Sequence, residues 1–388
     1  MSDTVDDMMF ELPDQYREIA GQARALAEQA VPYSDRADES DSVDPDMRRL
    51  LADSGLARLA VPERFGGLLP EVDSLAITVV REALAAESAH LDSLFCMQGI
   101  GSFAIVKGGS SAVQEAWLPR VASLDAIAGL SLTEPDVGSD LKAITTTLTR
   151  DGDMLRINGR KSFITNGGDA DFYSTLAVEE IDGQRAYSMV LVPADASGVS
   201  IERPHQIIAP HVLGDVIMED VVLPADHRLG EPGKGFALVL ATLSTFRVSV
   251  AGAALGLAEA ALVEAVRHAA GREQFGVTLD RLGGIPAALA MSWTEIEMAR
   301  ALTYRAAAAA ARDPRANLHL SSMAKVASTE MAGRVVDRCV QVMGRFGLVR
   351  GSRIERFYRE ARPMRIYEGS TEVILDSLAK QLVQRMAP

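Results

Sequence analysis

A short segment near the C-terminal end of the chain combines residue types that suit acid–base chemistry. Residues 365–372 read RIYEGSTE and interrupt two stretches with helical spacing. The segment places a carboxylate, Glu368, beside a glycine in an expected loop. On this local pattern alone, the simpler interpretation is a glutamate that caps a helix or faces solvent. A catalytic role for Glu368 therefore depends on signals elsewhere in the chain.

Other patterns in the sequence resemble cofactor, metal or nucleophile sites but lack the neighbouring residues or spacing that such sites require. Residues 99–104 (GIGSFA) match a loose dinucleotide fingerprint but follow a helix-like segment instead of a strand. Residues 230–235 (GEPGKG) lack the spacing and hydroxyl of a P-loop, and no GxSxG elbow is present. Six histidines show no ligand spacing, so we expect no metal site: His90, His205, His211, His227, His268 and His319.

The bulk composition excludes several classes of protein. A net charge of −14 argues against a nucleic-acid binder, which needs a basic face. The acidic segment 1–15 lacks the basic start and apolar stretch of a signal peptide, and no uninterrupted apolar run of about 18 residues appears. We therefore expect a cytoplasmic protein without a membrane span. Cys96 and Cys339 lie far apart and indicate buried free thiols instead of a disulfide.

The order of hydrophobic patterns predicts the fold. The 388 residues, 48% of them hydrophobic, suffice for two or three structural units. Helical spacing over 11–107 gives way to β-branched runs, which indicate strands at 144–149, 187–192 and 216–222. Long helical patterns return at 248–270, 288–312 and 321–343. The predicted fold class is α+β, mainly α, with an N-terminal helical domain (1–125), a middle β domain forming a small barrel or sandwich (126–234) and a C-terminal four-helix bundle (235–388).

Further segments, in order along the chain, resemble motifs of one enzyme family. Residues 130–140 (LSLTEPDVGSD) resemble its TEPxxGSD segment, and residues 158–168 (NGRKSFITNGG) its NGxKxWITNGG segment. Residues 272–276 (REQFG) match RxxFG, and residues 341–347 (QVMGRFG) resemble QxxGGxG. With RIYEGSTE, which resembles IYEGT, they make the chain similar to the acyl-CoA dehydrogenases over nearly its whole length.

The resemblance implies an FAD site shared between subunits. On the middle domain, the implied contacts are Leu130, Leu132, Thr133, Ser139, Phe163 and Thr165, with Ser139 at the pyrophosphate. On the bundle of a neighbouring subunit they are Arg272, Gln274, Phe275, Gln341, Gly344 and Gly347, with Arg272 balancing the pyrophosphate charge. Ser370 and Glu372 complete the implied cofactor set. A flavin held by two subunits implies a homo-oligomer, and we expect a homotetramer or at least a dimer.

The same resemblance implies the chemistry. Glu368 would remove an α-proton from an acyl thioester while the β-hydride passes to flavin N5, giving the trans-2-enoyl thioester. The backbone N–H of Glu368 and a flavin ribityl hydroxyl would polarise the thioester carbonyl. We expect the exclusion of water to raise the pKa of this base. The implied substrate-binding residues are Phe95, Gly99, Ser244, Phe246, Arg247, Tyr367 and Gly369.

The chain departs from the family pattern at several positions. Phe163 replaces the usual tryptophan and keeps an aromatic cover beside the flavin, so we expect FAD to be retained. Arg345 replaces the second glycine of QxxGGxG, and Gly283 stands where glutamine is usual. Contacts to pantetheine and to the CoA nucleotide are expected to differ because of changes at Ser244, His211, Leu213 and the pair Ile374-Leu375. The sequence therefore leaves open whether CoA or a carrier protein holds the thioester.

The leading hypothesis is an acyl-CoA dehydrogenase of fatty acid metabolism that passes electrons to an electron-transferring flavoprotein. One alternative is a family member with other thioester chemistry: oxidation by oxygen, isomerisation or β-elimination. Another is a non-catalytic flavin-binding subunit, against which Glu368 argues, since an inactive subunit needs no base. Phe95 and Phe246, near Cys96 and Gly99, favour a short, branched or ring-containing acyl group, unless these rings face the helical core.

Overall fold

The computed structural model describes residues 12–387, and this part of the chain divides into two compact units. The helical unit comprises the chain up to Asp35, Ser74–Ala89 and the chain from Arg247 onward. The mixed unit comprises Arg36–Asp73 and His90–Phe246. Residues 1–11 and Pro388 lie outside the described residues. Most of the acidic segment 1–15, from which no signal peptide was predicted, therefore lies outside them too. The division into three domains stays a prediction.

Helices of the mixed unit begin at caps that the sequence supplies. The carboxylate of Asp44 accepts hydrogen bonds from the backbone N–H groups of Asp46 and Met47, and Pro45 takes the first helical position. The Ser110 hydroxyl caps the next helix start in the same way. The elements are α2 (Pro45–Ser54), η1 (Leu56–Ala60), η2 (Glu63–Phe65), α4 (Ala89–Gly108) and α5 (Ser111–Ser123).

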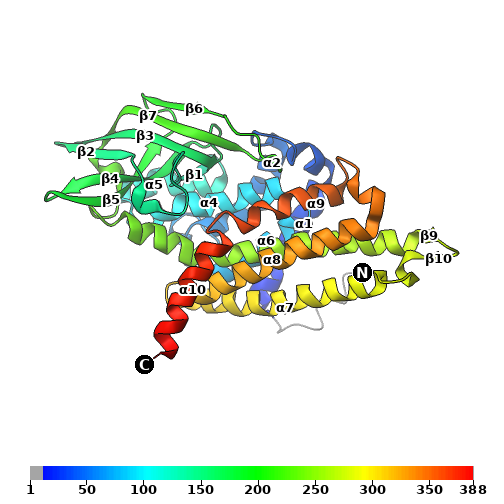
Figure 1. The fold of residues 1–388 in the computed structure, drawn as a ribbon. Helices are drawn as coiled ribbons and strands as arrows, with labels where there is room; N and C mark the ends of the chain where they lie inside the picture. Colours follow the sequence, from blue (N-terminus) through cyan, green and yellow to red (C-terminus); the bar gives the residue numbers. More distant parts are fainter. Residues whose placement is uncertain (1–11, 388) are drawn as a thin grey trace. The chain divides into compact units, whose positions relative to one another are not determined.

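A single sheet forms the rest of the mixed unit, in the order β6-β7-β3-β2-β4-β5-β8, with β1 parallel to β4 (Figure 1). The other neighbours pair antiparallel, except for a single parallel β2–β4 pair. The predicted strands at 187–192 and 216–222 lie within this sheet and are confirmed. The strands are β1 (Ala128–Ser131), β2 (Thr147–Asp151), β3 (Met154–Thr165), β4 (Phe172–Ile181), β5 (Gln184–Pro193), β6 (Val199–Glu202), β7 (Leu213–Pro224) and β8 (Arg228–Leu229), with η3 (Leu141–Ala143) and η4 (Ala225–His227) between them.

The strand predicted at 144–149 is wrong for its first half, because β2 begins only at Thr147. The backbone N–H groups of Thr145 and Thr146 donate to the Glu134 carboxylate at 2.6 and 2.9 Å instead of to a neighbouring strand. A buried carboxylate that captures two backbone donors removes them from the sheet.

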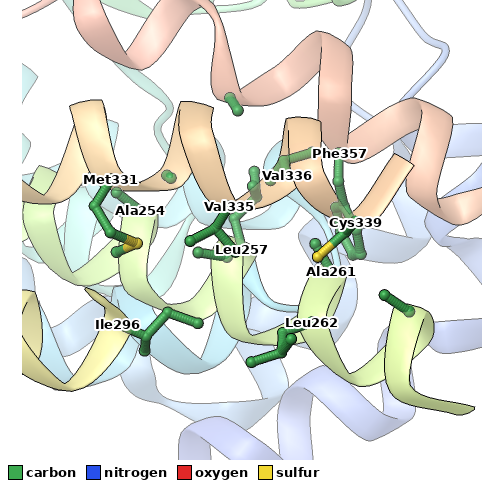
Figure 2. Packing of buried hydrophobic residues seen from close by; sticks show 14 of the residues in the cluster. Ala254, Leu257, Ala261, Leu262, Ile296, Met331, Val335, Val336, Cys339 and Phe357 are labelled. Atoms are coloured by element: carbon green, nitrogen blue, oxygen red, sulfur yellow. The ribbon is translucent and has the colours of Figure 1, made fainter. Parts of the chain in front are cut away.

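The helical unit packs long alanine-rich helices around an apolar core (Figure 2). Leu257 and Leu262 from α6, Ile296 from α7, and Val335 from α8 meet in this core. The predicted helical stretches at 248–270, 288–312 and 321–343 lie within α6, α7 and α8 and are confirmed. The elements are α1 (Asp14–Ala37), α3 (Ser74–Ala85), α6 (Gly235–Gly271), β9 (Glu273–Gln274), β10 (Val277–Thr278), η5 (Leu279–Arg281), α7 (Ile285–Arg312), α8 (Leu318–Met343), η6 (Gly344–Leu348), α9 (Arg353–Ala361), η7 (Pro363–Arg365) and α10 (Thr371–Met386).

A glycine on α6 permits the close approach of α3. A Cβ atom at Gly256 would lie 1.8 Å from the backbone carbonyl oxygen of Glu82. Any larger residue at Gly256 would push the two helices apart. The segment of α3 that carries Arg81 and Glu82 is thereby fixed against α6.

The predicted fold class is confirmed, with helices first, a β region in the middle and helices at the end. Both cysteines are buried and free, as predicted. Within the described residues, α4 and α6 are long and apolar enough to cross a membrane by length and composition. Their most apolar windows are 89% and 78% buried, however, as in core helices of soluble proteins.

Candidate active site

Glu368 lies in a tight loop between η7 and α10, as the sequence predicted. Its φ is +52°, in the left-handed region that residues other than glycine rarely adopt, and φ of Gly369 is +103°. A Cβ atom at Gly369 would lie 3.2 Å from Ile374 and 3.4 Å from a guanidinium nitrogen of Arg247. Such strain persists only where the surroundings hold the backbone in place.

Two cations, the half-buried Arg247 and the buried Lys325, hold the backbone of this loop. Arg247 Nε donates to the carbonyl oxygen of Glu368 at 3.1 Å, and its Nη1 donates to Ser322 Oγ at 3.1 Å. Lys325 Nζ donates to the carbonyl oxygen of Gly369 at 2.7 Å. Burial lowers the pKa of Lys325 to about 8, although the nearby Glu368 charge acts in the opposite direction. Burial also lowers the pKa of Arg247.

A third cation, the buried Arg81, approaches the carboxylate of Glu368 itself. Arg81 Nη1 lies 3.9 Å from Glu368 Oε1 and donates to Ser249 Oγ at 3.1 Å. The side chain of Arg81 is 2% exposed and that of Glu368 16%. The arrangement presents a mostly buried carboxylate of fixed orientation beside cations, which favour its ionised form, the form that can accept a proton.

Sequence reasoning missed Arg81, Ser249, Ser322 and Lys325. A signal for two of them was present, because Arg81 directly follows the mostly apolar run 75–80 of α3, and Lys325 is flanked by Met323, Ala324, Val326 and Ala327 in α8. A charge at such a place is buried and needs a partner. The partner was not predictable from local sequence, since Arg81 and Glu368 come from distant segments.

Other predicted residues of this loop are more exposed. Tyr367 is 38% exposed, and Glu372 lies on the exposed side of α10. Ser370 occupies the N-cap position of α10, where its side chain makes no capping bond. The Thr371 hydroxyl and Arg365 Nε both donate to Glu330 on α8, at 2.8 and 2.9 Å. The loop is thus attached to α8 on both sides of Glu368.

The predicted bundle residues cluster at one end of the helical unit. Arg272, Gln274 and Phe275 belong to the β9–β10 hairpin that follows α6 (Figure 1). The Arg272 guanidinium lies 5.7 Å from the centre of the Phe346 ring, which brings the hairpin to η6. Phe275 is 91% exposed. The cluster therefore offers an exposed aromatic ring and a guanidinium to a partner.

Gly344 and Gly347 of η6 require glycine for different physical reasons. Gly344 adopts φ +57° and ψ −134°, a combination that only glycine accommodates readily. A Cβ atom at Gly347 would lie 2.6 Å from the Val340 carbonyl oxygen. Gln341, at the end of α8, is exposed. The backbone of η6 is thus shaped by glycine at Gly344 and packed tightly at Gly347.

In the mixed unit, an ion pair links the two predicted flavin segments. Lys161 Nζ donates to Glu134 Oε1 at 2.9 Å and to the carbonyl oxygen of Leu132 at 3.1 Å. Burial acts to raise the pKa of Glu134, but hydrogen bonds and Lys161 outweigh it and hold that pKa at about 2. Burial lowers the pKa of Lys161 to about 8. The Ser162 N–H also donates to the Thr133 carbonyl oxygen at 2.9 Å, so the segments lie side by side.

Phe163 projects from an irregularity in β3. The register between β3 and β7 shifts between Lys161 and Ile164, and Phe163 has φ +56°. Its ring is 48% exposed and stacks on His205 at 4.1 Å. The carboxylate of Asp215 accepts from Ser162 Oγ and from the Phe163 N–H. A bulge of this kind redirects a side chain out of the sheet.

The remaining flavin candidates of the mixed unit lie near these segments in sequence. Leu130 lies within β1, while Leu132 and Thr133 follow this strand, and all three are half-buried. Thr165 pairs with Leu213 in the sheet and is half-buried. Ser139 is exposed in the following loop. Hydroxyl groups and an aromatic ring are thus available along β1 and β3.

The fold also joins part of the predicted substrate set. A Cβ atom at Gly99 would lie 2.4 Å from Phe246 Cε1, so the phenyl ring covers this glycine. The Phe246 ring contacts Phe103 edge to face at 5.4 Å. Phe95 and Phe246 are each 1% exposed. The Ser244 hydroxyl donates to the Leu240 carbonyl oxygen of its own helix at 2.7 Å.

Comparison with family models identifies the chain. The models for the N-terminal, middle and C-terminal domains of acyl-CoA dehydrogenase match residues 13–125, 129–221 and 233–383. Cyclohexane-1-carbonyl-CoA dehydrogenase of Geobacter metallireducens is 32% identical over 98% of this chain and 100% of its own. The mitochondrial short-chain specific acyl-CoA dehydrogenase of Sus scrofa is 32% identical over 94% of this chain and 89% of its own.

Solved structures share the fold. Butyryl-CoA dehydrogenase from Megasphaera elsdenii superposes with a TM-score of 0.91 at 29% identity, covering 97% of this chain and 100% of its own. An acyl-CoA dehydrogenase from Bacillus anthracis complexed with FAD superposes with a TM-score of 0.88 at 26% identity, covering 96% of this chain and 67% of its own. A chain from a structure of the electron transferring flavoprotein of Acidaminococcus fermentans superposes with a TM-score of 0.90 at 28% identity. The match covers 97% of this chain and 100% of that chain.

The chain belongs to the acyl-CoA dehydrogenase family. The enzymes of this family are flavoprotein oxidoreductases that bind FAD. The predicted family, class of enzyme and cofactor are therefore confirmed.

Proposed function

We propose that this protein dehydrogenates an acyl-CoA thioester between its α and β carbons, with Glu368 as the base. The observation that carries the proposal is the loop itself. A strained backbone places Glu368 beside Arg81, and Arg247 and Lys325 hold the loop through its carbonyl oxygens. The positive φ of Glu368 serves, in this proposal, to aim its carboxylate.

The residues present fit FAD. The mixed unit supplies hydroxyl groups at Thr133, Thr165 and Ser139, and the exposed ring of Phe163 offers an apolar face. The helical unit supplies a guanidinium at Arg272 for a pyrophosphate and an exposed ring at Phe275. When bound, the flavin accepts the hydride that leaves the β carbon.

Glu368 accepts the α-proton at a carboxylate oxygen. Its side chain is only 16% exposed, so little water competes for the proton or screens the nearby charges. The backbone N–H of Glu368 is the proposed donor to the thioester carbonyl, where charge develops as the proton leaves. Arg247 and Lys325 fix the orientation of both groups through the loop carbonyls. Tyr367 and Gly369, on either side of the base, complete the proposed substrate contacts in the helical unit.

We propose a homo-oligomer, most simply a homotetramer. Its support is the cluster formed by the exposed Phe275 and Gln341 with the half-buried Arg272, which would complete the flavin site of a neighbouring subunit. We also propose an electron-transferring flavoprotein as the electron acceptor. Its support is the similarity to the chain from the Acidaminococcus fermentans structure. A cytoplasmic location stays a prediction.

We propose a short, branched or ring-containing acyl group. Its support is the Phe246 ring that covers Gly99, together with Phe103 and Phe95, which leaves little apolar space around Gly99. The relatives named for cyclohexane-1-carbonyl-CoA and for short-chain substrates are in line with this proposal.

One experiment separates dehydrogenation from the alternatives. The purified protein is mixed anaerobically with a panel of acyl-CoAs, and flavin bleaching is followed while products are identified by mass spectrometry. Bleaching with a product two hydrogens lighter supports the proposal. An eliminated or isomerised product without bleaching would favour other thioester chemistry, and no reaction with any thioester would favour a non-catalytic subunit.

A further inference from the structure

A buried arginine of the mostly apolar helix α3 lies next to the proposed base. Ten of the twelve residues of α3 are buried, among them Arg81. Arg81 Nη1 lies 3.9 Å from Glu368 Oε1, and the same nitrogen donates to Ser249 Oγ at 3.1 Å. Taking a guanidinium out of water costs several kcal/mol unless an opposite charge and hydrogen bonds compensate. The Glu368 carboxylate supplies the opposite charge.

The next residue along α3 belongs to a separate group of charges. The Glu82 carboxylate accepts hydrogen bonds from Arg300 and, at 2.6 Å, from the Tyr304 hydroxyl. Arg300 also donates to Glu259. Consecutive residues on a helix project about 100° apart, so Arg81 and Glu82 serve different partners. The charge of Arg81 is directed at the loop of the proposed base.

The charges that face this loop come from four helices. Arg247 of α6 and Lys325 of α8 donate to the backbone carbonyl oxygens of Glu368 and Gly369. Arg81 of α3 approaches the carboxylate. The acidic groups in the same surroundings are Glu330 of α8 and Glu372 of α10. Burial favours the neutral form of a carboxyl group, whereas a cation within about 4 Å favours the ionised form and shifts the pKa by about 1–3 units.

We propose that Arg81 is a positioning residue that holds the Glu368 carboxylate in place and keeps it ionised at neutral pH. This inference rests on the proposed function, in which Glu368 must be ionised to accept the α-proton. After the proton moves from the α carbon to the carboxylate oxygen, Glu368 is neutral and its attraction to the Arg81 guanidinium is lost. The same attraction then favours release of that proton to solvent and restores the base.

The first test is the pH dependence of flavin reduction in three variants. Arg81→Met removes the charge, Arg81→Lys retains it, and Arg356→Met removes another buried arginine, paired with Asp35 on α1. In Arg81→Met the acid limb should move to higher pH by about one unit or more. Arg81→Lys should keep the acid limb close to its wild-type position, and Arg356→Met should leave the limb unchanged. An unchanged acid limb in folded, FAD-loaded Arg81→Met would overturn the proposal.

The second test needs no substrate turnover. Infrared difference spectra between the wild-type protein and Glu368→Gln report the protonated-carboxyl C=O band of Glu368 as pH is varied. The proposal predicts an ionised Glu368 at pH 7 in the wild type and a protonated fraction at pH 7 in Arg81→Met. A protonated Glu368 in the wild type at pH 7 would overturn it, even if Arg81→Met failed to fold.

The two tests also distinguish this inference from the proposed function. If no acyl-CoA bleaches the flavin while the infrared titration shows Arg81 controlling Glu368, the proposed function fails and the electrostatic relationship stands. If the flavin bleaches and Glu368→Gln is inactive, but neither titration changes in Arg81→Met, the proposed function stands and the electrostatic relationship fails.

Discussion

Lys325 donates a hydrogen bond from its buried ammonium group to the carbonyl oxygen of Gly369, 2.7 Å away and one residue beyond Glu368. Lys325 is a buried residue in the first third of α8, so this bond connects the helical unit's interior to the loop before α10. Arg247 makes the equivalent bond one residue earlier. Both bonds go to backbone carbonyl oxygens, so these two side chains orient the proposed base through its backbone and not through its carboxylate.

Lys325→Met should lower the rate of flavin reduction by about 10–100-fold, because a charged hydrogen bond worth about 1.5–3 kcal/mol no longer holds the loop. The pKa of Lys325 is about 8, so the ammonium loses its proton as pH rises through about 8. The wild-type rate should therefore fall on an alkaline limb near this pH. Stopped-flow measurements across pH in both proteins check this, with exposed Lys380→Met as the control. A variant with wild-type rate and the same alkaline limb would rule out this role.

Gly369→Ala should impair the enzyme more than its stability. Alanine at φ +103° with contacts to Ile374 and Arg247 costs about 1–3 kcal/mol and shifts the carboxylate of Glu368. We expect a loss of at least about tenfold in the rate of flavin reduction. Gly183→Ala is the matched control, since Gly183 has φ +73° with nothing within 4 Å of its Cβ position. Equal rates in the two variants would show that the Gly369 loop does not position the base.

Glu134→Gln should weaken FAD binding in the mixed unit. The substitution leaves Lys161 buried without its counter-charge, which costs about 3–5 kcal/mol, and releases the segment that carries Thr133. Adding Lys161→Met should recover part of the stability. Denaturant midpoints and FAD content per subunit measure both effects. Full FAD content in a destabilised Glu134→Gln variant would show that FAD binding does not depend on this ion pair.

Phe246→Leu should extend the range of acyl chains. A smaller side chain over Gly99 leaves apolar space that a longer chain fills. We expect the ratio of kcat/KM for octanoyl over butyryl thioester to rise by about tenfold, or about 1.4 kcal/mol. Phe357→Leu, which changes a buried ring on α9, should leave the ratio unchanged. A wild-type maximum at palmitoyl thioester would already defeat the short-chain proposal.

The sequence predicted the elements well where local periodicity decides them. The helices of the bundle and the strands at 187–192 and 216–222 are examples. The predicted strand was wrong at residues 144–146, where the distant Glu134 carboxylate accepts the backbone N–H groups of Thr145 and Thr146. Residues 99–104 lie inside α4, where Gly101 and Gly99 pack closely against Ala128 and Phe246.

The proposed site was predictable only through motifs. RIYEGSTE located Glu368, but its surroundings depend on contacts between distant segments. Arg81 precedes Glu368 by most of the chain, and no local pattern joins them. The positive φ of Glu368 was equally hidden, because this residue type gives no signal for it.

The most direct test of the central claim is anaerobic mixing of Glu368→Gln with the best acyl-CoA of the panel. The variant should purify with full FAD and bind the thioester, while flavin bleaching slows by several orders of magnitude through the loss of the base. Asp376→Asn, an exposed change on α10, serves as the control and should bleach at the wild-type rate. Bleaching of Glu368→Gln at an unchanged rate would remove Glu368 from the mechanism and contradict the account.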